Sequence, residues 1–320
     1  MTSTPYRGRF APSPTGPLHP GSLLAALGSW LLARHARGHW LVRIEDVDPP
    51  RTVPGAVAAQ RAALDALGLT SDAAVVHQSQ RGARYQQAID RLLRDGTAFA
   101  CHCSRSELAG QGGIHHHCVA RTERAQPAIR LRVPPGSVVR FHDGLRGTIE
   151  QDVHAQVGDV VLRRADGYWA YQLAVVVDDG DQGITDVVRG ADLLDSTPRQ
   201  ILLQQALQLP TPRYLHLPLL LDAQGRKLSK SDGADALDPG QPLPALRRAW
   251  CQLGQLPFAT AEACDAAGWL RQAAARFEPA RLPPGDIRLP DTGAGTAAAP
   301  ADVAESSSPL VGPAVRSSCS

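Results

Sequence analysis

The chain contains 320 residues, of which 43% are hydrophobic, and this length allows one large domain or two modest ones with an ample core. Its formal net charge of +2 excludes a polycation, so an RNA partner would have to be bound by local basic patches. The sequence has no stretch of roughly 20 apolar residues that could span a membrane. Its first residues, MTSTPYRG, lack the apolar segment of a secretory signal. We therefore expect a soluble, cytoplasmic protein.

The N-terminal third predicts the start of a βαβ unit. Residues 8–11 form a short apolar approach to a turn rich in Pro, Ser, Thr and Gly, and a helical pattern follows over residues 23–37. Residues 40–44 (WLVRI) then predict a strand. Two further helices are expected over residues 56–67 and 84–93, and the second of them ends at an Asp-Gly pair typical of a helix C-cap.

Residues 97–130 break this pattern with Cys, His and Gly, and we expect them to form an insertion. Two cysteines lie two residues apart, and a group of histidines and a third cysteine follows about a dozen residues later. This spacing is typical of a closed tetrahedral zinc site. The alternative is a reduced, histidine-rich loop that binds metals only adventitiously. The candidate ligands are Cys101, Cys103, Cys118 and one of His115, His116 and His117.

The middle of the chain returns to strand alternation over residues 128–133 and 160–164, and residues 165–167 (ADG) predict a hairpin-like turn. Residues 173–177 (LAVVV) form a continuous apolar run, which predicts a strand buried on both faces. This strand would end at Asp178-Asp179, at the edge where open α/β sheets place their ligands.

The C-terminal part contains a predicted helix over residues 198–207 and a basic loop, KLSKS, over residues 227–231. After about residue 258 the composition shifts to Ala, Pro, Gly and Ser, which cannot build a core at the end of the chain. We therefore expect an α/β core over residues 1–257, which includes the insertion, and a largely disordered extension over residues 258–320.

The segment RFAPSPTGPLHPGS, residues 9–22, predicts a phosphate site at the start of a helix. A helix N-terminus offers free N–H groups and the positive end of the helix dipole. Gly16 and Gly21 permit close approach of the backbone, and His19 can donate a hydrogen bond to a phosphate. Taken alone, such a segment is more often only an ordinary turn before a helix.

The basic loop supplies the matching cations. Lys227 and Lys230, beside Ser229 and Ser231, can neutralise charge that develops on a polyphosphate in a transition state. The plain alternative is a solvated surface loop.

Together, the two segments resemble the two signatures of class I aminoacyl-tRNA synthetases. Residues 9–18, 43–48, 171–179 and 183–190 resemble the glutamyl branch of that class. Four further features narrow the resemblance to one group within that branch. They are the C-x-C pair, the Gly-Gly-Ile at 112–114, the RGADL at 189–193 and the early end of the chain, about ninety residues after Lys230. The resemblance extends over roughly residues 6–255 to the glutamyl-queuosine tRNA(Asp) synthetases, which lack an anticodon-binding domain. Such enzymes have an α/β, Rossmann-like nucleotide-binding fold with a zinc-bearing insertion and a short helical C-terminal part.

The resemblance implies a role for individual residues. For glutamate it implies Arg9, Ser13, Glu45, Tyr171 and Arg189. For ATP it implies Pro12, Gly16, His19, Gly21, Lys227, Ser229 and Lys230, with His19 and Lys230 as catalytic residues. For structural zinc, one ion per chain, it favours His115 as the fourth ligand beside Cys101, Cys103 and Cys118. Departures from the family pattern occur at Pro20, at Ser22, which replaces a second histidine, and at Leu228.

Other structural interpretations of the same residues stay open. Residues 43–48 would also suit a surface strip of ion pairs, and Arg189 would also suit a structural pair with Asp192.

The implied reaction uses ATP, Mg²⁺ and L-glutamate to form glutamyl-adenylate without tRNA. The glutamyl group then passes to the cyclopentene-diol of queuosine at the wobble position of tRNA(Asp). One alternative is a truncated synthetase that charges the 3′ end of a tRNA. A second is a non-catalytic relic that binds tRNA. Neither a membrane nor an obligate protein partner is expected.

Overall fold

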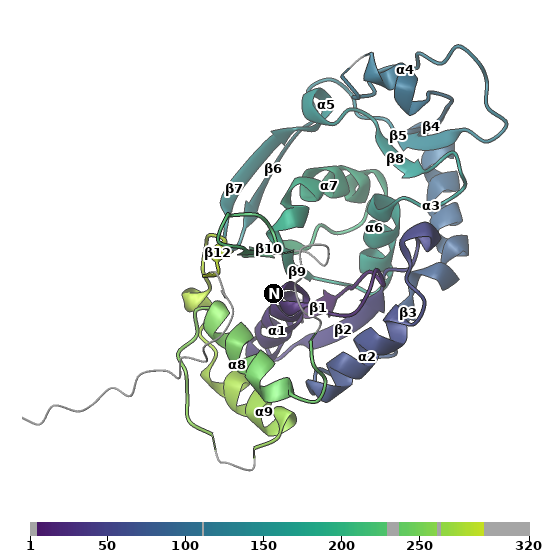
Figure 1. Cartoon of the computed structure of the whole chain (residues 1–320). Helices are drawn as coiled ribbons and strands as arrows, with labels where there is room; N and C mark the ends of the chain where they lie inside the picture. Colours follow the sequence, from purple (N-terminus) through teal and green to yellow (C-terminus); the bar gives the residue numbers. More distant parts are fainter. Residues whose placement is uncertain (1–4, 111, 229–236, 261–263, 291–320) are drawn as a thin grey trace, which may run out of the picture. The chain divides into compact units, whose positions relative to one another are not determined.

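A seven-stranded sheet organises the chain in this computed structural model, which describes residues 5–110, 112–228, 237–260 and 264–290 (Figure 1). In spatial order, the strands are β3 (Val76–His77), β2 (His39–Ile44), β1 (Arg7–Phe10), β9 (Asp186–Gly190), β10 (Arg213–Leu217), β6 (Val138–Asp143) and β7 (Gly147–Asp152). All neighbours are parallel except β6 and β7. Because β1 leads to β2 on one side and pairs with β9 on the other, the strand order reverses between β1 and β9, the position at which such sheets bind ligands.

The remaining described strands form two smaller sheets. The three-stranded antiparallel sheet contains β4 (Ala98–Cys101), β5 (Ala128–Leu131) and β8 (Val160–Arg163), and the two-stranded one contains β11 (Leu220–Leu221) and β12 (Ile287–Arg288). The strands expected at 128–133 and 160–164 are confirmed. A bridge between Arg163 and Trp169 closes the expected turn. Strand β8 lies beyond residue 130, so the sheet that contains Cys101 uses more than the predicted insertion.

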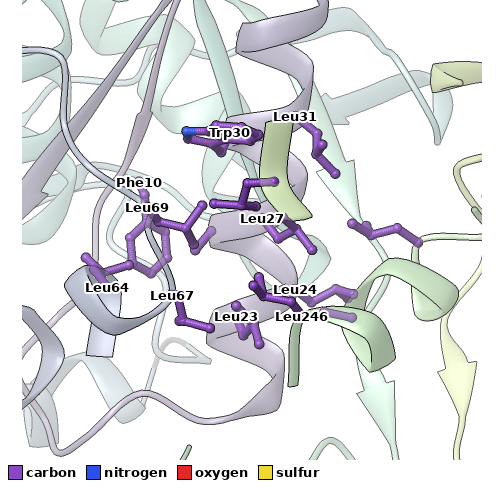
Figure 2. Close-up of a cluster of buried hydrophobic side chains, with 14 of the residues drawn as sticks. Phe10, Leu23, Leu24, Leu27, Trp30, Leu31, Leu64, Leu67, Leu69 and Leu246 are labelled. Carbon is purple, nitrogen blue, oxygen red and sulfur yellow. The ribbon is translucent and has the colours of Figure 1, made fainter. Parts of the chain in front are cut away.

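The described residues also form α-helices. They are α1 (Pro20–His35), α2 (Ala56–Ala66), α3 (Gly82–Arg94), α4 (Arg105–Ala109), α5 (Val153–Gln156), α6 (Tyr171–Asp181), α7 (Thr197–Ala206), α8 (Pro242–Gln252) and α9 (Ala266–Arg276). The four helices predicted from periodicity correspond to α1, α2, α3 and α7, which confirms those predictions. Figure 2 shows leucines of α1 packed with Phe10 of β1, Leu64 of α2 and Leu246 of α8. This cluster anchors the N-terminus of α1 beside the end of β1.

The strand predicted at residues 173–177 is wrong, because these residues belong to helix α6. Every residue from Leu173 to Asp179 is buried, so this helix is packed on all sides and carries no polar stripe. A short apolar run of this kind does not distinguish a buried strand from a buried helix. Asp178 and Asp179 are therefore on a helix rather than at the end of a strand.

The packed unit runs to Leu289, beyond the limit at residue 257 that composition predicted. Trp269 and Leu270 of α9 are buried in the same cluster as α1. The rings of Trp250 and Trp269 meet edge to face at 5.8 Å, which is a favourable arrangement of aromatic quadrupoles. These buried side chains help to fold an alanine-rich segment onto the core. Residues 291–320, where disorder was predicted, lie outside the described residues.

Among the described residues, none of the helices combines the length and the apolar character that crossing a bilayer requires.

Candidate active site

A cavity of about 320 Å³ opens at the carboxyl ends of β1 and β9, where the strand order reverses. Residues from the predicted glutamate and ATP sets line it together. They are Arg9, Pro12, Ser13, His19, Gly21, Glu45, Tyr171, Arg189 and Lys227. Gly16 lies in the preceding turn, where its carbonyl oxygen accepts a hydrogen bond from Gln60. Ser229 and Lys230 lie outside the described residues.

The predicted histidine, His19, caps the N-terminus of α1. His19 is the N-cap residue, and its Nδ1 accepts a hydrogen bond of 3.3 Å from the backbone N–H of Ser22. The neutral ring then carries its proton on Nε2, the atom able to donate to a phosphate. Because Ser22 contributes only its backbone to this cap, the loss of a second histidine there leaves the cap intact.

Gly16 and Gly21 are suited to their positions for different steric reasons. Gly16 has a φ of +136°, a conformation that L side chains rarely adopt. At Gly21, a Cβ atom would lie 3.1 Å from Cε1 of His19, so the glycine leaves the imidazole its place above the helix end.

Beneath the cavity lies a buried ionic cluster of Arg9, Arg43, Glu45 and Asp179. The Nε of Arg9 donates to Asp179 at 3.0 Å, and Nη1 of Arg43 donates to the same oxygen at 2.8 Å. Nη2 of Arg43 also donates to Glu45 at 3.3 Å. The side chain of Arg43 is 0% exposed, so the alternative of a surface strip of ion pairs is wrong for this residue.

The two carboxylates of this cluster have pKa values that are shifted in opposite directions. Burial would raise the pKa of Asp179, but Arg9 and Arg43 outweigh it and hold that pKa below its ordinary value. For Glu45, burial dominates and raises the pKa despite the nearby guanidinium groups. Glu45 therefore lacks one favourable charge, which an ammonium group in the cavity would supply.

Arg189 has a different environment from Arg9. Its Nη2 donates to Thr197 at 2.9 Å, its Nε donates to His216 at 3.1 Å, and its Nη1 lies 3.4 Å from the hydroxyl of Tyr171. None of the ion pairs formed within the described residues includes Arg189, although it is only 6% exposed. The expected alternative pair with Asp192 is absent there, because Asp192 pairs with Lys227 at 2.6 Å. A buried guanidinium without a carboxylate partner is suited to an anionic ligand.

A second cavity, of about 430 Å³, adjoins the first and shares Ser13, Thr15, Glu45 and Tyr171 with it. Its arginines come from widely separated parts of the chain: Arg51, Arg105, Arg130, Arg164 and Arg199. Trp169 adds an aromatic surface to the same wall. Cations and an aromatic ring suit the phosphates and bases of a nucleic acid.

The predicted metal ligands also come together. One ligand atom from each of Cys101, Cys103, His115 and Cys118 lies within 4.8 Å of the other three. Nε2 of His115 is 3.2 Å from the sulfur of Cys101. The structure therefore brings His115 to the three cysteines, rather than His116 or His117.

The donor chemistry of this cluster fits a divalent cation. Burial, followed by the charges of the two neighbouring cysteines, raises the pKa of Cys118 to about 11. A bound cation would relieve this repulsion and stabilise the thiolates. Nδ1 of His115 faces Asp159 at 2.8 Å, the carboxylate–histidine arrangement that orients metal ligands.

The site is completed by Arg43, which was expected only as part of residues 43–48, and by four residues that the sequence did not single out: Asp143, Asp159, Thr197 and His216. Arg43 lies between buried Val42 and Ile44 on β2, and His216 lies between half-buried Leu215 and buried Leu217 on β10. A charged or titratable residue between apolar neighbours was the available signal.

Comparisons with known proteins agree with this geometry. The family model of the class I tRNA synthetases (E and Q), catalytic domain, matches residues 6–278. A glutamyl-Q tRNA(Asp) synthetase from Xanthomonas campestris is 66% identical over 283 residues, which cover 88% of this chain and 95% of that protein. Another from Burkholderia mallei is 56% identical over 266 residues and covers 78% of this chain and 89% of that protein.

The fold is also similar to that of a solved structure. The crystal structure of a glutamate tRNA ligase from Elizabethkingia meningosepticum in complex with its amino acid superposes with a TM-score of 0.75 at 26% identity. The match covers 89% of this chain and 67% of that one. The predicted class I synthetase fold is thereby confirmed. The chain belongs to the class I tRNA synthetases (E and Q) and, among them, to the glutamyl-Q tRNA(Asp) synthetase family.

Proposed function

We propose that this chain activates L-glutamate with ATP and Mg²⁺, without tRNA, and transfers it to the cyclopentene-diol of queuosine at the wobble position of tRNA(Asp). The observation that carries the proposal is the 66% identity, over nearly the whole of a relative, to a glutamyl-Q tRNA(Asp) synthetase. In the first step a glutamate carboxylate attacks the α-phosphorus of ATP, and pyrophosphate leaves. In the second step a diol hydroxyl attacks the acyl carbon and loses its proton, and AMP leaves.

The charges around the first cavity support glutamate as the amino acid. Arg189 offers a guanidinium with no carboxylate partner among the described residues, and Arg9 lies on the same wall. Guanidinium groups bind carboxylates with two parallel hydrogen bonds. Glu45 would bind the ammonium group, while Ser13 and Tyr171 line the same space. An amino acid with two carboxylates and one ammonium group matches this set.

The start of α1 supports ATP as the second substrate. His19, Gly21 and Lys227 line the cavity where the N–H groups of the helix end are directed outward. Pro12 and Gly16 shape the turn that precedes the helix. Such donors stabilise negative charge that develops at phosphorus without forming covalent bonds to it.

The second cavity is where we place the modified nucleoside. It adjoins the glutamate pocket through Glu45 and Tyr171, so an acceptor hydroxyl that enters there would approach the activated carboxyl group. The arginines around it supply the local basic surface that a nearly neutral chain needs to bind RNA.

We further propose that Cys101, Cys103, His115 and Cys118 hold one structural zinc ion per chain. When bound, the ion would fix the end of β4 to the loop that carries Cys118 and so stiffen the segment beside the second cavity. Four protein ligands leave no open position for a substrate.

The function is tested first by pyrophosphate exchange. The chain with glutamate, ATP and Mg²⁺ is expected to exchange labelled pyrophosphate into ATP in the absence of any RNA. Glutamine and aspartate serve as controls, because neither offers Arg189 and Glu45 the same spacing of charges. Absence of exchange in a folded preparation would contradict the proposal and favour a tRNA-binding relic.

The acceptor is tested with two preparations of tRNA(Asp). Labelled glutamate is expected to be transferred to tRNA that carries queuosine and not to tRNA that lacks it. Mild periodate oxidation of the cyclopentene-diol is expected to abolish the transfer. Equal labelling of both preparations at the 3′ end would instead identify a truncated synthetase that charges tRNA.

The zinc site leads to a prediction about Asp159. This carboxylate accepts from Nδ1 of His115 and from the backbone N–H of Val133 at 2.7 Å. Asp159→Asn is expected to weaken zinc binding by about 10- to 100-fold, because it removes the charge that orients His115. Competition with a chromophoric chelator measures the change. Asp152→Asn is the matched control, since Asp152 only caps α5. Equal zinc affinity in both variants would exclude this role for Asp159.

A further inference from the structure

Arg189 is held by a hydrogen bond that fixes the protonation state of its neighbour. The Nε–H of an arginine can only donate, so Nε2 of His216, at 3.1 Å, must accept. The imidazole is therefore neutral, with its proton on Nδ1. Thr197 supports this arrangement, because its hydroxyl accepts from Nη2 of Arg189 at 2.9 Å and lies 3.3 Å from the same Nε2.

Asp143 fixes the other side of the ring. Its Oδ2 lies 2.6 Å from Nδ1 of His216, and both side chains are 0% exposed. The carboxylate also accepts from the backbone N–H groups of Leu145 and Arg146. Burial would raise the pKa of Asp143, but its hydrogen bonds with His216, Arg146 and Leu145 hold it below its ordinary value. A permanent anion therefore faces Nδ1 and selects the tautomer that leaves Nε2 free to accept.

The three residues occupy neighbouring strands of the large sheet. Arg189 on β9 pairs in register with His216 on β10, and Asp143 at the end of β6 pairs with Tyr214 on β10. The order of the side chains across the sheet is therefore set by strand pairing rather than by a loop. A line of hydrogen bonds therefore runs from Asp143 on β6 through His216 on β10 to Arg189 on β9, whose side chain lines the cavity.

We propose that Asp143 and His216 are positioning residues that orient Arg189 toward the substrate carboxylate. This inference rests on the proposed function, in which glutamate is the ligand of Arg189. With Nε held by His216 and Nη2 held by Thr197, the guanidinium is fixed in one plane. The Nη1 edge, which lies 3.4 Å from the Tyr171 hydroxyl, is then directed to the cavity that both residues line.

The arrangement has a consequence for pH. Burial lowers the pKa of His216 below its ordinary value, Asp143 opposes this effect, and the positive charges of Arg189 and Arg9 add to it. Tyr214, whose ring centroid lies 6.2 Å from that of His216, is a further titratable neighbour. The imidazole is consequently neutral and gains a proton at a lower pH than an ordinary histidine does. A protonated ring would present an N–H to the Nε–H of Arg189 and displace it.

The test is a set of glutamate titrations in pyrophosphate exchange at pH 7.5. His216→Phe is expected to raise the KM for glutamate by about 10- to 100-fold, because it removes the acceptor of a charged hydrogen bond, and to leave the KM for ATP unchanged. His216→Gln is expected to restore most of the affinity, since its amide offers an acceptor to Arg189 and a donor to Asp143. Tyr214→Phe is the control, because it keeps the ring beside His216 and loses only the hydrogen bond to Gln204.

A pH series separates positioning from packing. As the pH falls, the KM for glutamate is expected to rise more steeply in the wild-type chain than in His216→Gln, which keeps the other titratable groups that line the pocket, including Glu45, His19 and Asp192. Identical profiles would overturn the proposal, and so would a folded His216→Phe variant with a wild-type KM for glutamate. If the wild-type chain itself shows no glutamate-dependent exchange, the proposed function fails instead.

Discussion

Replacement of Arg43 with leucine is expected to lower the free energy of unfolding by about 3–5 kcal/mol. Arg43 is fully buried, and its guanidinium lies between Asp179, at 2.8 Å, and Glu45, at 3.3 Å. Asp178 is also within 4.0 Å of its Nε. Leucine would fill part of the space but would leave these carboxylates buried with one cation fewer.

The acids around Arg43 cannot escape to water, which is why the effect should be large. Asp178 is held by Gln78 and Tyr85, each at 2.8 Å, and Asp179 is held by Arg9. The carboxylates raise the pKa of Arg43 further above its ordinary value, although burial acts in the opposite direction. The protein therefore stabilises the charged guanidinium, and its removal reverses that stabilisation.

A matched variant distinguishes burial from pairing. Arg34 forms a two-pronged pair with Asp72 at 2.7 and 2.8 Å, but both side chains are 26% exposed. Arg34→Leu is expected to cost about 1 kcal/mol or less, as exposed pairs do. Urea unfolding measures both variants. Equal losses would show that the buried cluster contributes no more than a surface pair.

The sequence was sufficient to predict elements with strong local patterns. Helix α1 carries leucines at helical spacing, although it begins at Pro20, three residues before the predicted start, and β2 is rich in apolar residues and ends just before the acidic Glu45. Helix α6 could not be recognised in this way, because its all-apolar centre carries no period. The predicted strand also misplaced Asp179, whose helical position lets it reach Arg9.

The residues of the candidate site also differ in how far the sequence could predict them. Residues within one motif, such as His19 and Gly21, are brought to the cavity by local geometry. The contacts between motifs depend on tertiary structure: Arg9 and Asp179 are 170 residues apart, and His216 and Asp143 are 73 apart. No spacing rule connects such pairs. The pairing of β6 with β10 brings Asp143 to His216, and the position of Asp179 on α6 lets it reach Arg9 of β1.

Replacement of Lys230 with alanine is expected to lower the rate of adenylate formation by about 10²- to 10³-fold and to leave the fold unchanged. Lys230 lies outside the described residues, but Lys227 and Leu228 of the same loop line the cavity. Lys227 already pairs with Asp192 at 2.6 Å, so part of its charge is offset before ATP binds. A second cation is therefore needed to balance the charge that builds up on the departing pyrophosphate.

The form of the kinetic change tests this role. A group that acts only in the transition state lowers kcat without raising the KM for glutamate, whereas a group that binds the ground state raises KM. Arg226→Ala is the matched control, because it removes an exposed positive charge that pairs with Asp222 on the same loop. Exchange near the wild-type rate in Lys230→Ala would show that the basic loop is a solvated surface. An equal loss in both variants would show that the loop acts through its net charge rather than through a placed ammonium group.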